Sequence, residues 1–185
     1  MKESFSSFVF YLKSFELPLQ HLVTHYLGET SGPNSFKSDL GKKIVELKQP
    51  EIVNFTPIPT DELPEIPDDV IKDLSRDQNL LYRTTRAVMS GICPQSLASA
   101  TLGPVSHSRW LTLAVRILVY YMSLAVPPYP IKRLANFIVN IYVPQWFNLR
   151  LHWRATDAPR ILFNGLRAML KLPVDEQEVV LPVFQ

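Results

Sequence analysis

The spacing of apolar residues along the chain predicts a mainly α fold. Apolar residues recur at helical intervals over residues 76–90 and most strongly after residue 109. Ser75 with Gln78 has the pattern of a capping box, and Gly91 is a natural helix end, so the helix over 76–90 is defined at both termini. Further helical segments are expected over residues 4–15, 17–27, 94–101, 131–142, 159–170 and 175–180.

Residues 48–75 interrupt this pattern. Prolines recur there, at 50, 57, 59, 64 and 67, and they remove backbone donors and favour extended conformations. The apolar residues between them are Ile52, Phe55, Ile58, Leu63 and Ile66. We therefore predict an irregular helical domain with an extended proline-rich acidic arm. One structural unit would comprise an N-terminal helical segment (1–47), the arm packed on the domain (48–75) and a basic helical domain (76–185).

Charge divides the chain more sharply than its net value of +2 suggests. Residues 48–77 hold eight acids against three basic residues, whereas residues 83–171 hold eleven basic residues and one acid, Asp157. The chain therefore has an acidic segment and a strongly basic half. Attraction between the arm and the basic half would also help the arm to dock, in a salt-sensitive way.

Catalytic chemistry has little support in the residue pattern. The acids are segregated in the arm, and carboxylate catalysis or a metal pair needs several acids at one place. His21 and His25 have metal-pair spacing, but Leu22 stands where a zincin motif needs glutamate. Cys93 is the only cysteine, and the glycines form no phosphate loop. We predict no catalytic residues, no metal site and no cofactor.

The interleaving of cations with aromatic residues in the basic half is typical of nucleic-acid binding. An ordinary solvated cationic face, with the tryptophans in the core, is the competing interpretation. The best contact candidates are Arg109, Arg116, Lys132, Arg133, Arg150 and Arg154. Arg109 and Arg116 are seven residues apart and are expected on the face opposite the apolar one.

Two apolar stretches, residues 110–126 and 134–147, leave a membrane-associated helical hairpin as an alternative. Arg116 at the centre of the first stretch opposes insertion, because a central arginine costs about 2.5 to 3.5 kcal/mol. A single cysteine favours a reducing, intracellular setting.

Several strings together resemble an uncharacterised, transposon-derived protein family of animal genomes, itself similar to hAT-type transposases with an RNase H-like core. They are ELPLQHL (16–22), TSGP (30–33), LGK (40–42), DQ (77–78), SGICP (90–94), HSRWLT (107–112) and FIVNIYVPQWF (137–147). That family carries a cysteine and a histidine where this chain has Phe10 and Lys13.

The resemblance implies a middle piece of such a transposase, chiefly the helical region inserted into the core, with the catalytic acids outside this chain. The expected function is a non-catalytic helical domain that binds DNA or a protein partner, including a second copy of itself, through the basic surface. The nucleus is then a more natural location than the cytoplasm. An inactive or incomplete transposase fragment is the remaining alternative.

Overall fold

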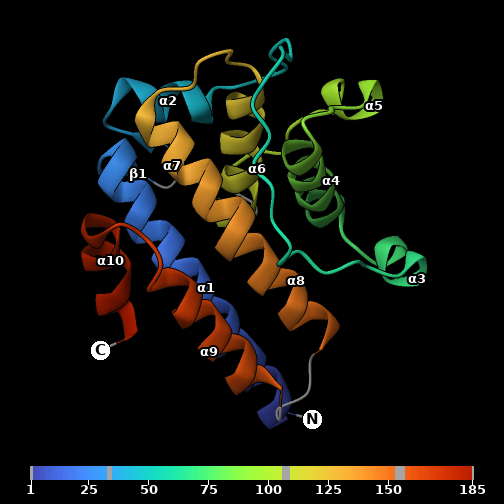
Figure 1. The fold of residues 1–185 in the computed structure, drawn as a ribbon, viewed down its shortest axis with the longest axis vertical. Helices are drawn as coiled ribbons and strands as arrows, with labels where there is room; N and C mark the ends of the chain where they lie inside the picture. The colour runs from blue at the N-terminus through green and yellow to red at the C-terminus, as the bar shows by residue number, and fades with distance from the viewer. Residues whose placement is uncertain (1, 33–34, 106–108, 153–156, 185) are drawn as a thin grey trace.

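The computed structural model describes residues 2–32, 35–105, 109–152 and 157–184, and helices dominate them (Figure 1). The predicted mainly α fold is confirmed. The elements are α1 (Lys2–Leu27), β1 (Thr30–Gly32), β2 (Ser35–Phe36), α2 (Asp39–Val45), α3 (Asp68–Lys72), α4 (Arg76–Ser90), α5 (Gln95–Ala98), α6 (Arg109–Met122), α7 (Tyr129–Phe137), the π-helical η1 (Ile138–Tyr142), α8 (Val143–Leu151), α9 (Ala158–Met169), α10 (Val174–Val180) and the 3-10 helix η2 (Leu181–Phe184). The two short strands pair antiparallel.

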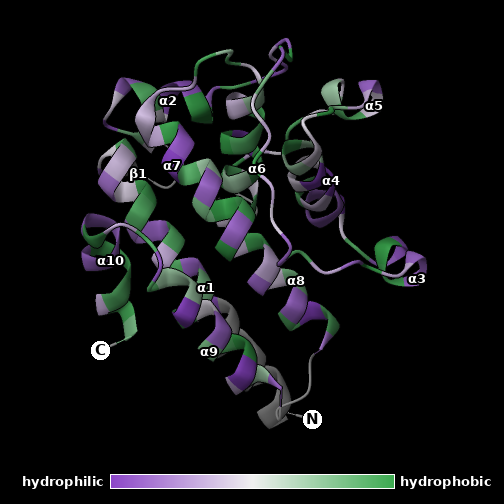
Figure 2. Cartoon of the chain, viewed as in Figure 1, coloured by the Kyte–Doolittle hydropathy of each residue, from purple (hydrophilic) through white to green (hydrophobic). Residues whose placement is uncertain are grey.

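The core lies around α6 and the continuous run α7–η1–α8. α4 packs on α6, α1 packs on α7, α9 and α10, and α8 packs on α9. Residues 111–118 and 141–147 are buried without interruption, and hydrophobic residues dominate α6 in Figure 2. Most of each stretch considered for a membrane hairpin therefore lies in the protein interior, although Val126 at the end of the first is 80% exposed. Over the described parts of the chain, no helix has the length and apolar character needed to cross a bilayer.

α4 begins and ends where the sequence predicts. Gln78 N–H donates to Ser75 Oγ at 3.3 Å, and Ser75 N–H donates to Gln78 Oε1 at 3.0 Å, which completes the capping box. Gly91 then adopts a left-handed conformation with φ of 74°, which glycine accepts without steric cost. The helix is thus fixed by local chemistry at both ends.

The N-terminal helix is longer than expected, because α1 passes through Pro18. An internal proline costs about 3 kcal/mol through its missing donor and its clash with the previous turn. Phe15, Leu19 and Leu22 on either side are at most 1% exposed, and burying such side chains contributes about 1.5 to 3 kcal/mol each. Tertiary packing therefore outweighs the local signal, and the predicted break near residue 17 is wrong.

The helix expected to end at Tyr142 also continues, through η1 into α8. The Val143 N–H donates to the Ile138 carbonyl, the five-residue spacing of a π turn. This turn immediately precedes Pro144, whose ring would clash with the Asn140 carbonyl in a regular α-helix. The wider turn accommodates the proline, and one helical run extends from residue 129 to 151.

The arm crosses α4 and α6 as an extended segment. Val53 N–H donates to the Met122 carbonyl at 3.1 Å, Ile58 N–H donates to the Val88 carbonyl at 3.0 Å, and Phe55 is 6% exposed. The other apolar arm residues also pack on the core: Ile52, Ile58, Leu63 and Ile66. The arm thus lies on the core as an extended segment, except that residues 68–72 form the short helix α3.

Candidate nucleic-acid interface

Arg116 lies inside the protein, 7% exposed. Its Nη1 donates to the carbonyls of Ile44, Val45 (3.0 Å) and Leu47, and its Nη2 donates to the Gly103 carbonyl at 2.8 Å. α2 ends at Val45, so the guanidinium binds carbonyls at and just after the helix end, of which that of Ile44 also accepts from the Leu47 N–H at 3.3 Å. Burial lowers the pKa of Arg116. The expectation of a surface arginine here is wrong, because α2 and the Gly103 loop cover that face of α6.

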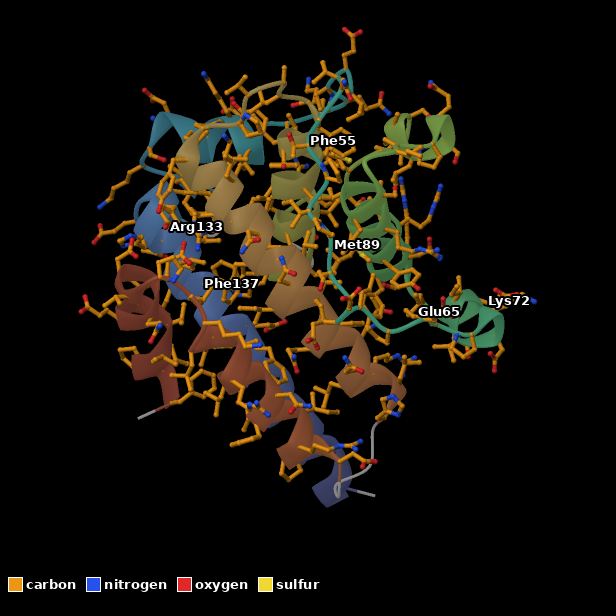
Figure 3. All side chains as sticks on the ribbon, in the orientation of Figure 1. Phe55, Glu65, Lys72, Met89, Arg133 and Phe137 are labelled. Atoms are coloured by element: carbon orange, nitrogen blue, oxygen red, sulfur yellow. The ribbon has the colours of Figure 1, made fainter. Side chains whose placement is uncertain are left out.

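Arg133 is also engaged internally. Its Nε and Nη2 donate to the two oxygens of Glu176 at 2.6 and 2.7 Å, and the Glu176 side chain is completely buried. Tyr26 O–H donates to the same carboxylate at 2.7 Å. The hydrogen bond to Glu176 raises the pKa of Arg133, and burial together with Glu176 raises that of Tyr26. Arg133, labelled on α7 in Figure 3, therefore joins α7 to α10 and α1 rather than offering a surface contact.

Of the other four predicted contacts, the structure describes the side chains of Lys132 and Arg150 alone, and these two do not share one surface. Lys132 and Arg150 are exposed, but they lie 18 residues apart along the α7–η1–α8 run, a separation of about 27 Å. The side chain of Arg109 and the whole of Arg154 are outside the described part of the chain.

A denser basic surface lies on α4, outside the six residues predicted as contacts. Arg76, Arg83 and Arg86 are all exposed, and their spacing of seven and three residues places them on one helix face. Arg76 and Arg86 lie ten positions apart, about 15 Å along the helix axis. The spacing of these three arginines in the sequence already indicates that they share a helix face. We call this set the α4 arginine stripe.

Each arginine of the stripe is oriented by one neighbour. Arg76 Nη2 donates to the Thr101 carbonyl at 3.1 Å, and Arg83 Nη2 donates to Ser96 Oγ at 2.9 Å. The Arg86 guanidinium lies over the Tyr82 ring, 5.8 Å from its centroid. A guanidinium has five N–H donors, so these contacts leave most donors available. Among the described residues, none of the three forms an ion pair.

A hollow of about 390 Å³ adjoins the stripe between α3, α4 and the segment after α5. Its charged lining residues are Lys72, Arg76 and Arg83, and Figure 3 shows Lys72 at the outer end of α3. α3 and its flank also carry exposed acids, Asp68, Asp69 and Asp73, but none of these lines the hollow. Three cationic residues therefore line one depression without an acid among them, a composition that favours an anion such as phosphate.

The basic residues of α9 have different surroundings. Arg160 Nη2 lies 3.6 Å from Asp157 Oδ1, and two hollows bring the arm acids close to this helix. Asp61 and Glu62 line one hollow with Arg160, and Glu62 lines the other with Arg167 and Lys171. The arm therefore reduces the positive potential over α9, whereas no described acid lines the hollow beside the α4 stripe.

The groups considered for catalysis are dispersed. Within the described ranges, no three His, Cys, Asp or Glu side chains are close enough together to hold a metal ion. His21 and His25 are exposed on α1, and Asp157 is engaged with Arg160. Burial raises the pKa of the Cys93 thiol despite the nearby Arg83, which disfavours the reactive thiolate.

Comparison with protein-family models, curated proteins and solved structures finds no match to the chain. The resemblance to the transposon-derived family stays a prediction.

Proposed function

We propose that this chain is a non-catalytic, transposase-derived helical domain that binds the phosphate backbone of nucleic acid through the α4 arginine stripe. The observation that carries the proposal is the alignment of Arg76, Arg83 and Arg86 on one exposed helix face without a described acidic partner. Arginine pairs with phosphate bidentately, and such contacts give affinity without base specificity. A nuclear location follows from this proposal.

The shape of the stripe supports backbone binding over recognition of base edges. Its guanidinium groups are held by Thr101, Ser96 and Tyr82, so less side-chain entropy is lost when a ligand binds. The hollow with Lys72 lies at the start of the same face and could take one phosphate, while Arg83 and Arg86 contact the next ones along a strand.

The test is binding of a fluorescein-labelled 20-nucleotide DNA, single-stranded and duplex, followed by fluorescence anisotropy at low salt. The variant Arg76→Gln/Arg83→Gln/Arg86→Gln should lose at least about 100-fold in affinity, because each phosphate contact contributes strongly at low ionic strength. Its melting temperature should stay close to that of the unchanged protein, since all three residues are exposed.

The matched control is Lys132→Gln/Arg150→Gln/Arg167→Gln, which removes the same charge from exposed positions outside α4. It should retain most of the affinity. Equal losses in both variants would show that only total charge matters, and no binding by the unchanged protein would refute the proposal.

Association with a protein partner is the second candidate, favoured by the exposed face of α9. Phe163 and Leu170 are 60% and 58% exposed and seven residues apart, so they share a helix face. Large exposed apolar side chains grouped in this way are typical of protein contacts. Light scattering of the variant Phe163→Ser/Leu170→Ser tests self-association. A smaller particle mass for the variant than for the unchanged chain supports self-association. A monomeric mass for both proteins excludes it.

A further inference from the structure

The hollow beside the α4 arginine stripe is lined by more than cations. Its lining also includes four apolar residues: Ile71, Leu74, Leu80 and Ala100. The amide side chain of Asn79 lines it as well. The volume of about 390 Å³ is within the range of small-ligand sites. Contacts to a phosphate backbone leave this apolar lining without a role, so the hollow is suited to a larger group than one internal phosphate.

Cations stand on two sides of the hollow. Lys72 comes from α3, whereas Arg76 and Arg83 come from α4. Lys72 forms no ion pair with another described residue. An internal phosphodiester carries one negative charge, whereas a terminal phosphate monoester carries about 1.5 to 2 negative charges at pH 7. A terminal phosphate therefore matches three cations better than an internal one does.

Acidic residues lie beyond the hollow, at the end of the α4 arginine stripe. α3 and α5 lie at opposite ends of α4 (Figure 1), and the hollow is at the α3 end. Asp68 and Asp69 are exposed and stand one helical turn before Lys72. A strand that followed the stripe past the hollow would bring its next phosphates close to these carboxylates, and like charges repel. The arrangement therefore favours a strand that ends in the hollow.

We propose that the hollow between α3 and α4 binds the phosphorylated end of a nucleic-acid strand. This inference rests on the proposed function, because the rest of the strand lies along the α4 arginine stripe. The terminal phosphate pairs with Lys72, Arg76 and Arg83. The sugar and base of the last nucleotide cover the apolar lining, and the Asn79 amide donates to or accepts from them. The end can be 5′ or 3′, which the probes below distinguish.

The test compares four forms of one 20-nucleotide single-stranded DNA that carries fluorescein on an internal base. They are the 5′-phosphorylated, the 3′-phosphorylated and the unphosphorylated linear strand, and the covalently closed circle. Fluorescence anisotropy at low salt measures the affinity of the full chain for each form. One phosphorylated strand should bind at least about fivefold more tightly than the unphosphorylated strand and the circle, through charge-assisted contacts that only a phosphorylated end provides.

Single substitutions separate the hollow from the stripe. Lys72→Gln should reduce the preference for the phosphorylated end to less than about twofold, through loss of a charge-assisted contact. The matched control Lys132→Gln changes an exposed lysine outside α3 and α4 and should preserve the preference. Arg86 does not line the hollow, so Arg86→Gln should weaken the binding of all four DNAs by a similar factor. All three residues are exposed, and the melting temperature should stay close to that of the unchanged protein.

The acids of α3 give a further test. Asp68→Asn/Asp69→Asn removes the repulsion beyond the hollow, so affinity for the circle should rise and approach that for the phosphorylated strand. The control Glu51→Gln/Asp61→Asn removes the same charge from exposed positions of the arm. It should leave the difference between the circle and the phosphorylated strand unchanged.

The outcomes distinguish this inference from the proposed function. Equal affinities for all four DNAs would overturn the inference and leave the proposed function standing. A full preference for the phosphorylated end in Lys72→Gln would also overturn it, because the end would then bind elsewhere. If none of the four DNAs binds, the proposed function is refuted, and the inference with it.

Discussion

The arginines of α4 and those of α6 and α7 come from the same basic part of the sequence, yet their surroundings differ completely. Arg83 and Arg86 are exposed and have no described ion pair. Arg116 is enclosed by main-chain carbonyls, and Arg133 is bound to the buried Glu176. The former can bind a ligand, while the latter hold elements of the fold together.

The comparison shows why a count of charges overstates a binding surface. Eleven basic residues stand between positions 83 and 171, but two of them are used inside the protein. Those of α9 share their hollows with acids of the arm. Position in the fold, and not local charge density in the sequence, decides which cations are available to a partner.

The largest effect is expected at Arg116. Replacement by methionine keeps much of the side-chain volume but removes the donor of the Val45, Leu47 and Gly103 carbonyls, and should lower the free energy of unfolding by about 3 to 5 kcal/mol. Urea unfolding followed by circular dichroism measures this. A loss below about 1 kcal/mol, the range of an ordinary surface substitution, would contradict the interior role of this arginine.

Glu176 should rank second. The variant Glu176→Gln retains the shape but leaves the charge of Arg133 uncompensated, and a loss of about 2 to 3 kcal/mol in unfolding free energy is expected. Adding Arg133→Met to Glu176→Gln should recover part of the lost unfolding free energy, since the double variant no longer contains an uncompensated charge at this place. Additive losses in the double variant would argue against a coupled pair.

A smaller effect, of opposite sign, is expected at Glu16 on α1. Burial raises the pKa of this carboxyl, although Lys13 opposes the shift. The folded state thus binds the proton more tightly than the unfolded state, and ionisation costs stability as pH rises above the carboxyl range. Glu16→Gln should therefore stabilise the protein at pH 7, by less than about 1 kcal/mol, and the gain should vanish below about pH 4. Thermal melts at both pH values measure it, and a loss of stability at pH 7 would contradict the sign.

The smallest change in stability belongs to the stripe. Arg83→Gln removes one exposed charge and one hydrogen bond to Ser96, and should change the unfolding free energy by less than about 0.5 kcal/mol. The same urea assay applies. A loss as large as that of Arg116→Met would place Arg83 among the structural arginines.

Local signals in the sequence predicted much of the fold. The capping box of Ser75 and Gln78 and the terminal Gly91 define α4 because both devices act within a few residues. The segment around Pro18 was predicted wrongly because packing of Phe15 and Leu19 by distant helices decides it. The helix end predicted at Tyr142 was also wrong, because a π turn before Pro144 lets the helical run continue through the proline.

The candidate site was less predictable. Periodicity placed Arg116 opposite the apolar face of α6, but it could not show that the end of α2, some 70 residues earlier in the chain, covers that face. The partner of Arg133 stands 43 residues away. By contrast, the spacing of Arg76, Arg83 and Arg86 could be read from the sequence. The sequence could not show that no described acid forms an ion pair with them.

The salt dependence of DNA binding measures how many phosphates the α4 arginine stripe contacts. The logarithm of the association constant for duplex DNA should fall linearly with the logarithm of salt concentration, by about 0.9 for each phosphate contact. The account predicts that Arg76→Gln/Arg83→Gln/Arg86→Gln reduces this slope by about 2 to 3, while Lys132→Gln/Arg150→Gln/Arg167→Gln changes it by less than about 1. An unchanged slope in the α4 variant, or the larger reduction in the other variant, would contradict it.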